Sequence, residues 1–240
     1  MDHDLRRPQE SPWSFARKAG GIVGKLLTGK GDARVDGAKR LLAYALWSRP
    51  RSDIDRYLQV APRLPDKALE QARLFADRVA MLKACPRNGI VVEVGTWRGD
   101  FSRHIAEQLQ PAEFHLVDLD FGPLDEDGVR SRFKGELAKH AGDSATTVRE
   151  LGRDFADMIY VDADHSYEGV RRDLAAAHFA LKPGGTMMCN DYTNWCSYSV
   201  EPYGVARAVN EFVADQAYTV AGLALEPGGL YDILLVKPGK

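Results

Sequence analysis

Short apolar runs alternate with segments of helical periodicity from Ile90 onward, and this alternation constrains the fold more than any other feature of the chain. Seven runs have the length and composition of strands: residues 90–96, 113–120, 145–150, 157–164, 184–191, 218–226 and 230–237. Helical segments lie between the early runs, at residues 100–109, 126–141 and 167–181. Such alternation predicts an α/β domain with a doubly wound, mainly parallel sheet of seven strands.

The last two apolar runs are an exception to the alternation. Only the short segment "EPGG" separates residues 218–226 from residues 230–237. Parallel strands need a crossover of a dozen or more residues, whereas antiparallel strands are joined by short turns. We therefore expect these two strands to pair as an antiparallel hairpin at the end of the domain.

The residues before Pro86 have helical character. The segment "GAKRLLAYALW" predicts a helix that ends before Pro50. In residues 65–86, four apolar side chains fall on one face of a helix: Ala72, Phe75, Val79 and Leu82. The sequence thus predicts a helical extension at residues 36–85, followed by an α/β domain at residues 86–240.

The first segment, residues 1–35, mixes apolar and basic side chains. An amphipathic basic helix on a membrane surface is one interpretation, but the adjacent Gly20 and Gly21 weaken a helix there. We expect docking on the protein's own core, or disorder, in preference to membrane binding. The spacing in "GKLLTGKG" is that of a phosphate-binding P-loop, but Gly31 stands where that motif needs Ser or Thr.

The composition is that of an ordinary soluble domain. Of the 240 residues, 45% are hydrophobic and 28% are charged, and the formal net charge is −2. This balance gives no reason to expect a nucleic acid as partner. The three cysteines form no CxxC pair, and we see neither a secretory signal nor an apolar run long enough to span a bilayer. We expect a cytoplasmic protein.

The first motif with chemical content is "VVEVGTWRGDFSRHIAEQL". A strand ends near Glu93, a loop follows between Gly95 and Gly99, and a helix begins at Asp100. Glycines in such a loop permit a sharp turn and a close approach of the backbone to a ligand. A dinucleotide fingerprint would have glycine where Trp97 stands. An acid facing the loop suits a ligand with an amino or cationic group better than a pyrophosphate.

The following strands add acids at the same edge of the predicted sheet. Asp118 ends the second strand, where an acid accepts hydrogen bonds from ribose hydroxyls. Asp143 and Ser144 lie at the edge of the third strand, where they can hold an adenine. Each of these residues by itself is equally consistent with a turn or a cap. Their joint order along successive α/β units favours a ligand site, because ligands of open α/β sheets bind at the carboxyl ends of strands.

With these motifs the sequence resembles the class I S-adenosylmethionine-dependent methyltransferases. "EVGTWRGDFS" is similar to the ExGxxxG motif of that family, "LVDLD" to its second-strand acid, and "LKPGGTMMCNDY" to its fifth strand with the preceding turn. Within the family, "VDADHSYEGVRRDL", "NDY" and "GVARAVNEF" are similar to small-molecule O-methyltransferases, including those that methylate sugars of macrolides. The resemblance covers roughly residues 81–240 and implies a Rossmann-like methyltransferase fold.

The resemblance also implies site residues. The cofactor-binding set is Glu93, Gly95, Thr96, Gly99, Ser102, Asp118, Asp143 and Ser144. In this set, Glu93 would face the methionine moiety of S-adenosylmethionine. Asp118 would bind the ribose, and Asp143 with Ser144 would bind the adenine.

Related metal-dependent O-methyltransferases bind magnesium through acids that end the fourth and fifth strands. The matching positions here are Asp162, Asn190 and Asp191. Asn190 departs from the pattern, since the sugar enzymes usually have aspartate there. An amide oxygen is still a ligand that suits Mg²⁺ or Ca²⁺, so the sequence leaves a magnesium site as a hypothesis.

The carboxyl end of the fourth strand is also where a methyl acceptor would bind. A hydroxyl acceptor must lose a proton, and the pKa range of histidine suits His165 to take it. A bound metal would be the alternative means of activating the hydroxyl. Asp162 and His165 are the predicted catalytic residues, although His165 is also consistent with a polar residue at a helix start that Asp164 caps.

The function that we expect is S-adenosylmethionine-dependent methylation of a hydroxyl on a small molecule, such as a sugar or another secondary metabolite. Two alternatives remain at this point: a non-catalytic binding or scaffold protein of the same fold, and an NAD-dependent oxidoreductase. The intact cofactor loop argues against the first, and the missing GxGxxG argues against the second. The helical extension is expected to cover the acceptor pocket as a lid.

Overall fold

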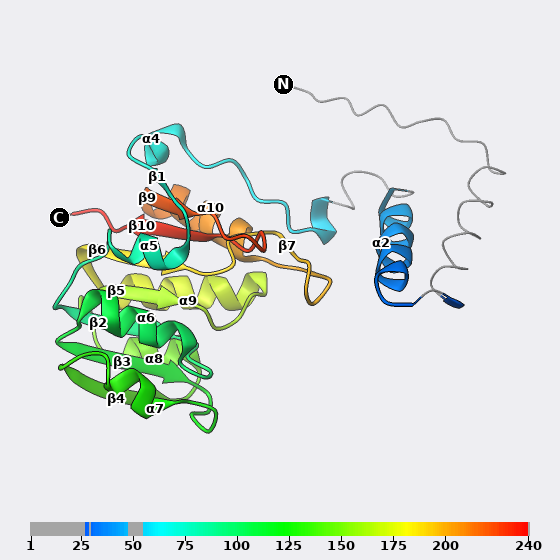
Figure 1. Ribbon diagram of the computed structural model, residues 1–240. Helices are drawn as coiled ribbons and strands as arrows, with labels where there is room; N and C mark the ends of the chain where they lie inside the picture. Colours follow the sequence, from blue (N-terminus) through cyan, green and yellow to red (C-terminus); the bar gives the residue numbers. More distant parts are fainter. Residues whose placement is uncertain (1–26, 29, 48–54, 240) are drawn as a thin grey trace. The chain divides into compact units, whose positions relative to one another are not determined.

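The computed structural model describes residues 27–28, 30–47 and 55–239, in two compact units with bounds Met1–Arg56 and Tyr57–Lys240 (Figure 1). In the first unit, helix α2 (Asp32–Trp47) contains the helix that the sequence predicted at residues 37–47. Most of the basic segment 1–35 lies outside the described residues, so the hypotheses about it stay predictions. No helix among the described residues is long and apolar enough to cross a membrane.

An eight-stranded sheet forms the centre of the second unit, in the order β1-β9-β10-β6-β5-β2-β3-β4. Its strands are β1 (Arg73–Phe75), β2 (Ile90–Val94), β3 (Glu113–Asp118), β4 (Glu136–Ala141), β5 (Ala156–Val161), β6 (Leu181–Cys189), β9 (Thr219–Ala224) and β10 (Asp232–Val236). All neighbours pair in parallel except β10, which is antiparallel to both β6 and β9. The chain winds outward from β2 to β3 and β4 and then returns to β5, so β2 and β5 flank a topological switch point.

Helices cover both faces of this sheet (Figure 1). One apolar cluster joins one sheet face to α5 (Arg78–Leu82), α6 (Asp100–Leu109) and α7 (Glu126–Arg130). A second cluster joins the other face to α8 (Ser144–Glu150), α9 (Tyr167–Ala180) and α10 (Val205–Gln216). Successive strand residues alternate between the two clusters, as Val91 and Val92 do, because side chains alternate across a strand. The prediction of a doubly wound α/β fold is confirmed.

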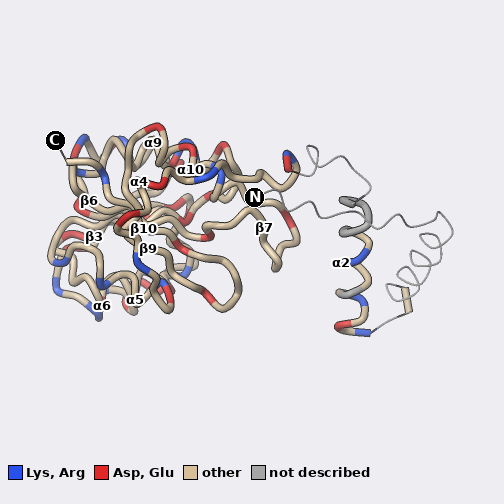
Figure 2. Tube along the Cα trace, turned by 90° about the horizontal axis from the view of Figure 1, so that it is seen from above, with Lys and Arg blue, Asp and Glu red and all other residues tan. Residues whose placement is uncertain are grey.

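Charged residues are interspersed over the second unit. Figure 2 shows lysines and arginines mixed with aspartates and glutamates along the trace, without a separate basic face. A small second sheet, β7 (Trp195–Cys196) with β8 (Glu201–Pro202), forms an antiparallel pair in the loop that follows β6.

The prediction of seven strands was wrong, because the sheet has eight and β1 is the additional strand. Residues 65–86 do not form one continuous helix but contain α4 (Asp66–Leu69), then β1, then α5. Strand β1 pairs in parallel with β9, and the Asp77 side chain caps α5 by accepting from the Ala80 amide. A strand of three residues has no periodicity to detect, and only its partner in the sheet stabilises it.

The segment between β3 and β5 was also predicted wrongly. Helix α7 ends at Arg130, and Glu136–Ala141 is the edge strand β4 instead of the second half of a helix. Residues 145–150, predicted as a strand, belong to α8, whose N-cap is Asp143. Pairing with β3 overrides the helix propensity of "ELAKHA". The sequence signal against a continuous helix was Gly135, because glycine is unfavourable inside a helix. In the structure, a Cβ on Gly135 would lie 2.1 Å from the Pro111 carbonyl oxygen.

The predicted C-terminal hairpin is confirmed. Strands β9 and β10 pair antiparallel, with Ile233 opposite Leu223. Strand β10 is inserted between β9 and β6, so its first residue, Asp232, lies close to the carboxyl end of β6 across the Ile233–Cys189 pair.

Candidate functional site

A cavity of about 920 Å³ lies at the carboxyl ends of the parallel strands. Its walls come from the segments that follow β2, β3, β4 and β5, from the N-terminal residue of α5, and from the end of the β7–β8 hairpin. This position is the switch point between β2 and β5, where open α/β sheets bind their ligands. The volume is near the upper limit of the ~300–1,000 Å³ that ligand pockets have, so the cavity has room for more than one small molecule.

The loop between β2 and α6, residues 95–99, is the glycine loop. Three of its residues have positive φ angles: Gly95 (+87°), Trp97 (+46°) and Gly99 (+77°). A Cβ on Gly95 would lie 2.0 Å from the carbonyl oxygen of Asp162, so glycine is needed for the β2 and β5 ends to approach each other. A Cβ on Gly99 would lie 2.8 Å from Leu124 Cδ1. Contacts inside the protein therefore account for both glycines, independently of any ligand.

Asp118, at the end of β3, holds the glycine loop in place. Its Oδ2 accepts hydrogen bonds from the backbone N–H groups of Thr96 and Trp97, each at 2.8 Å. From the part of the chain that the structure describes, its Oδ1 accepts a hydrogen bond only from the Asp120 amide, at 3.4 Å. Asp118 lines the cavity, so one carboxylate oxygen orders the loop and the other is left for a ligand. Ribose binding by Asp118 stays a prediction.

Glu93 lies directly beneath the glycine loop. Its side chain lines the cavity although the residue is only 1% exposed. Burial raises the pKa of Glu93 well above its usual value. Within the described residues, Glu93 Oε2 has no hydrogen-bond partner, and neither do Thr96 Oγ1 and Ser102 Oγ. Buried polar atoms rarely lack partners, so this group fits a ligand that donates hydrogen bonds.

Asp143 and Ser144 also line the cavity, at the end of β4. The Asp143 carboxylate caps α8 and pairs with Arg172 Nη2 at 2.7 and 2.8 Å, and hydrogen bonds from Arg172 and Thr146 lower its pKa to about 2. Ser144 Oγ donates to Asp173 Oδ1 at 2.5 Å. Both side chains thus have partners within the protein, and contact with an adenine stays a prediction.

Sequence reasoning missed two apolar residues of this region. Leu119 and Trp97 line the cavity, with 78% and 61% of their surface exposed. Large apolar side chains with this exposure are suited to cover the flat face of a ligand. The sequence signal for Leu119 was its position directly after Asp118, and the signal for Trp97 was its position within the glycine loop.

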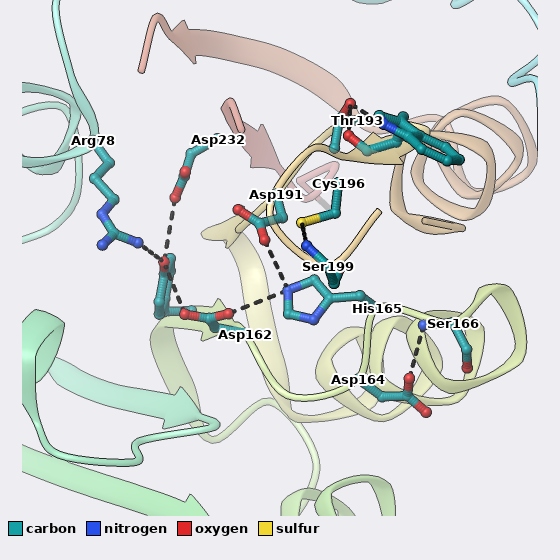
Figure 3. Close-up of polar contacts among 12 residues, drawn as sticks. Arg78, Asp162, Asp164, His165, Ser166, Asp191, Thr193, Cys196, Ser199 and Asp232 are labelled. Atoms are coloured by element: carbon teal, nitrogen blue, oxygen red, sulfur yellow. Dashed lines mark hydrogen bonds and ion pairs between the residues drawn. The ribbon is translucent and has the colours of Figure 1, made fainter. Parts of the chain in front are cut away.

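The second half of the site is an acid–histidine cluster of Asp162, His165 and Asp191 (Figure 3). Strands β5 and β6 are parallel neighbours, with Val161 opposite Cys189, so the acids that follow them meet. His165 Nε2 lies 3.5 Å from Asp162 Oδ1 and 3.3 Å from Asp191 Oδ2. The structure thus brings together both predicted catalytic residues, Asp162 and His165, and two of the three predicted metal ligands, Asp162 and Asp191, with the ring nitrogen between the carboxylates.

The backbone around this cluster holds the imidazole ring in place. Asp191 has a φ of +51°, a strained conformation of the kind that concentrates at functional sites. The ring of Tyr203 stacks on His165 with centroids 4.6 Å apart and an interplanar angle of 19°. The Gly204 amide donates to the His165 carbonyl at 2.8 Å. The segment after β8 therefore covers one face of the imidazole.

The pKa values of both His165 and Asp191 are raised in this cluster, for different reasons. Burial lowers the pKa of His165, but Asp162, together with Asp191 and Asp164, raises it by more. Burial raises the pKa of Asp191, a change that the neighbouring His165 opposes. The histidine is therefore more basic than in water.

The predicted magnesium site finds no support in this arrangement. Among the described residues, no group of three or more His, Cys, Asp or Glu side chains is arranged to hold a metal ion. The imidazole nitrogen, at 3.3 and 3.5 Å from the two carboxylates, stands where a shared cation would bind, about 2.0–2.1 Å from each oxygen for Mg²⁺. Asn190 is 8% exposed, and its side chain makes no hydrogen bond among the described residues. These donors do not fit a magnesium site.

The structure also identifies Arg78, Tyr160 and Asp232, which the sequence analysis did not. Arg78 Nη1 donates to the Tyr160 hydroxyl at 3.2 Å, and that hydroxyl lies 3.3 Å from Asp232 Oδ2 and 3.4 Å from Asp162 Oδ2. Asp232 is fully buried, and burial raises its pKa to about 8. Arg78 belongs to the predicted extension 36–85, yet it lines the cavity. No local pattern connects these three residues, because they come from α5, β5 and β10.

Comparison with known proteins supports the methyltransferase interpretation. Residues 92–192 match the model of a family described as a methyltransferase domain. No curated protein matched the sequence. The fold is similar to that of the Burkholderia thailandensis 1,6-didemethyltoxoflavin-N1-methyltransferase, solved with S-adenosylhomocysteine, at 16% identity and a TM-score of 0.50 over 98% of this chain and 94% of that one.

Two further solved structures have the same fold. A SAM-dependent methyltransferase from Methanosarcina mazei is 9% identical, with a TM-score of 0.52 over 68% of this chain and all (100%) of that one. The tRNA methyltransferase TrmK from B. subtilis is 14% identical, with a TM-score of 0.50 over 69% and 67% of the two chains. Likeness at these identities shows the fold alone. The second unit has the Rossmann-like fold of methyltransferases, and the family match identifies residues 92–192 as similar to a methyltransferase domain.

Proposed function

We propose that the protein transfers the methyl group of S-adenosylmethionine to a hydroxyl group of a small molecule. The observation that carries this proposal is the position of His165: it lines the same cavity as the glycine loop and is held between two carboxylates. A cofactor on one side of a cavity and a histidine base on the other are what transfer to a hydroxyl requires.

The cofactor side of the cavity has groups for each part of S-adenosylmethionine. The unpartnered Glu93 Oε2 would accept from the amino group. Asp118 Oδ1, which receives a long hydrogen bond of 3.4 Å from the Asp120 amide, would accept from the ribose. Asp143 and Ser144 would lie at the adenine, with Leu119 against its face. When bound, S-adenosylmethionine would supply a methyl carbon that is open to attack by a nucleophile.

His165 would take the acceptor's proton. Its Nε2 faces Asp162 and Asp191, so in the neutral ring the proton resides there and Nδ1 remains as the base. Stacking on Tyr203 fixes the plane of the ring. Because the reaction needs an unprotonated acceptor oxygen and His165 supplies the base, no step requires a metal. A role for residues 36–85 as a lid remains a prediction.

The test combines binding and turnover. S-Adenosylmethionine should raise the melting temperature of the full chain by mass action, and NAD should not. With methyl-labelled cofactor, label should appear in at least one member of a panel of sugars, glycosides and phenols. Equal stabilisation by NAD would contradict the cofactor. Cofactor binding without transfer to any hydroxylated compound, but with transfer to amines or tRNA, would contradict the acceptor class.

A further inference from the structure

Three side chains that can carry a positive charge line the cavity among the described residues: Arg78, His165 and Arg172. Arg172 is engaged by both oxygens of Asp143. His165 lies between Asp162 and Asp191. Arg78 differs from both, because it forms no ion pair within 4.0 Å with any described residue, and its one side-chain hydrogen bond goes to the neutral Tyr160 hydroxyl. A guanidinium has five N–H donors, so Arg78 has donors to spare.

Contacts on three sides hold Arg78 in position. Its backbone amide donates to Glu226 Oε1 at 2.7 Å. Its guanidinium lies over the Phe101 ring, 4.6 Å from the centroid. Phe101 in turn packs on Tyr160, with ring centroids 4.5 Å apart. A long side chain with this support loses little further freedom on binding a ligand.

Arg78 also lies near enough to Glu93 for its positive charge to oppose the rise that burial causes in the pKa of that acid. Tyr160, which accepts the hydrogen bond from Arg78, is the cross-strand neighbour of Glu93 in the pairing of β5 with β2. Paired residues of neighbouring strands point to the same face of the sheet. An unpartnered acid and a cation with free donors are therefore adjacent at one end of the cavity.

We infer that Arg78 binds the carboxylate of the cofactor's amino-acid moiety, while Glu93 receives the amino group on the same carbon; this inference rests on the proposed function. An α-amino acid presents both charges a few ångströms apart, and an adjacent acid and guanidinium are complementary to it. The fork of the guanidinium suits a carboxylate.

The test compares two ligands that share their nucleoside and differ in the amino-acid moiety. S-Adenosylhomocysteine has that moiety, and 5′-methylthioadenosine lacks it. Titration calorimetry on the full chain should show that Arg78→Met weakens S-adenosylhomocysteine about 10–100-fold, the loss expected for charged hydrogen bonds. The affinity for 5′-methylthioadenosine should change less than about 2-fold, because that ligand never reaches Arg78. Arg78→Lys keeps the positive charge but lacks the forked guanidinium, so its affinity for S-adenosylhomocysteine should lie between that of the wild type and that of Arg78→Met.

Arg153→Met is the matched control. Arg153 lies over the Phe179 ring at 4.5 Å, much as Arg78 lies over Phe101, but it is not among the residues that line this cavity. The Arg153→Met variant should bind S-adenosylhomocysteine and 5′-methylthioadenosine with the affinities of the wild type. Equal weakening of both ligands by Arg78→Met, or no weakening of either, would overturn the assignment of Arg78. Failure of the wild type to bind either ligand would overturn the proposed cofactor, and the assignment with it.

Discussion

The cavity has two halves that are built in different ways. On the half that we propose binds the cofactor (the cofactor half), the geometry comes from the backbone: Gly95, Trp97 and Gly99 have positive φ angles, and Asp118 accepts hydrogen bonds from the loop amides. On the half that we propose binds the methyl acceptor (the acceptor half), the geometry comes from side chains of different segments, where Asp162 and Asp191 meet at His165. Changes to the first half should therefore disturb fold and binding together, whereas changes to the second should disturb chemistry and leave the fold intact.

The two halves also differ in how charge is neutralised. Glu93 is buried without an ion pair, and burial raises its pKa. In the acid–histidine cluster, each carboxylate lies within 4 Å of the imidazole. A carboxyl that lacks a fixed partner is suited to bind a charged ligand, and a compensated cluster is suited to move a proton.

The largest effect is expected for His165→Ala. Removing the base should lower kcat by about 10²–10⁴-fold, while the affinity for S-adenosylhomocysteine stays within a few-fold. Steady-state kinetics and calorimetry measure the two quantities. His104→Ala, an exposed histidine of α6, is the control and should change neither. A parallel loss of binding and turnover would mean that the two halves are not independent.

Gly95→Ala tests the cofactor half. The new Cβ would lie 2.0 Å from the Asp162 carbonyl and would force a residue with a φ of +87°. We expect a loss of about 2–4 kcal/mol in the free energy of unfolding, together with weaker cofactor binding. Denaturant titration measures the first. Gly184→Ala has the same backbone cost at φ +77° but meets nothing within 4 Å, so it should lose only about 1 kcal/mol. Equal losses would show that backbone strain alone explains the glycine.

Asp162→Asn tests charge on the acceptor half. A base must be unprotonated, so kcat/KM should rise with pH through a His165 pKa that lies above the usual value of about 6.5. Because Asp162 raises that pKa, the rise of kcat/KM with pH should occur at lower pH in the asparagine variant than in the wild type. A pH–rate profile of both proteins measures the shift. An unchanged limb would indicate that another group limits activity at low pH.

Asp232→Asn tests the buried acid behind the cavity. The folded protein holds the Asp232 proton up to about pH 8, whereas the unfolded chain releases it near pH 4. The folded state thus binds more protons between these values, and the wild type should lose stability as pH rises across that window. The variant should be more stable at pH 8, by up to about 5 kcal/mol for a window of roughly four pKa units, and nearly equal at pH 4. Thermal unfolding at both pH values measures this, and a less stable variant at pH 8 would contradict the protonated state.

The smallest effect is expected for metal removal. Because the imidazole of His165 stands between the two carboxylates, EDTA should change kcat/KM less than about 2-fold, and added Mg²⁺ should not raise it. Activity measured before and after dialysis against chelator gives the answer. Loss of activity that Mg²⁺ restores would show that the histidine moves aside for a metal.

The cofactor half was largely readable from the sequence. Alternating runs predicted a doubly wound sheet, and the order of Glu93, Gly95 and Asp118 located a ligand loop at its edge. Even so, β4 was predicted as part of a helix, and α8 was predicted as a strand. The helix-forming residues of "ELAKHA" and the β-branched residues of "ATTVRE" adopt the structure that tertiary contacts favour instead of the one that their propensities favour. Asp143 and Ser144 still fall at the cavity, since the end of β4 lies where the predicted strand began.

What the sequence by itself determined is local. The turn glycines, the acids that end strands and the short connection of the final hairpin act through neighbouring residues, so a few positions suffice to recognise them. Only the tertiary structure decided the rest: the eighth strand β1, the position of His165 between Asp162 and Asp191, and the approach of Arg78 to Tyr160. These contacts join residues from separate elements, and which side chains meet depends on sheet order and packing, which no local pattern contains.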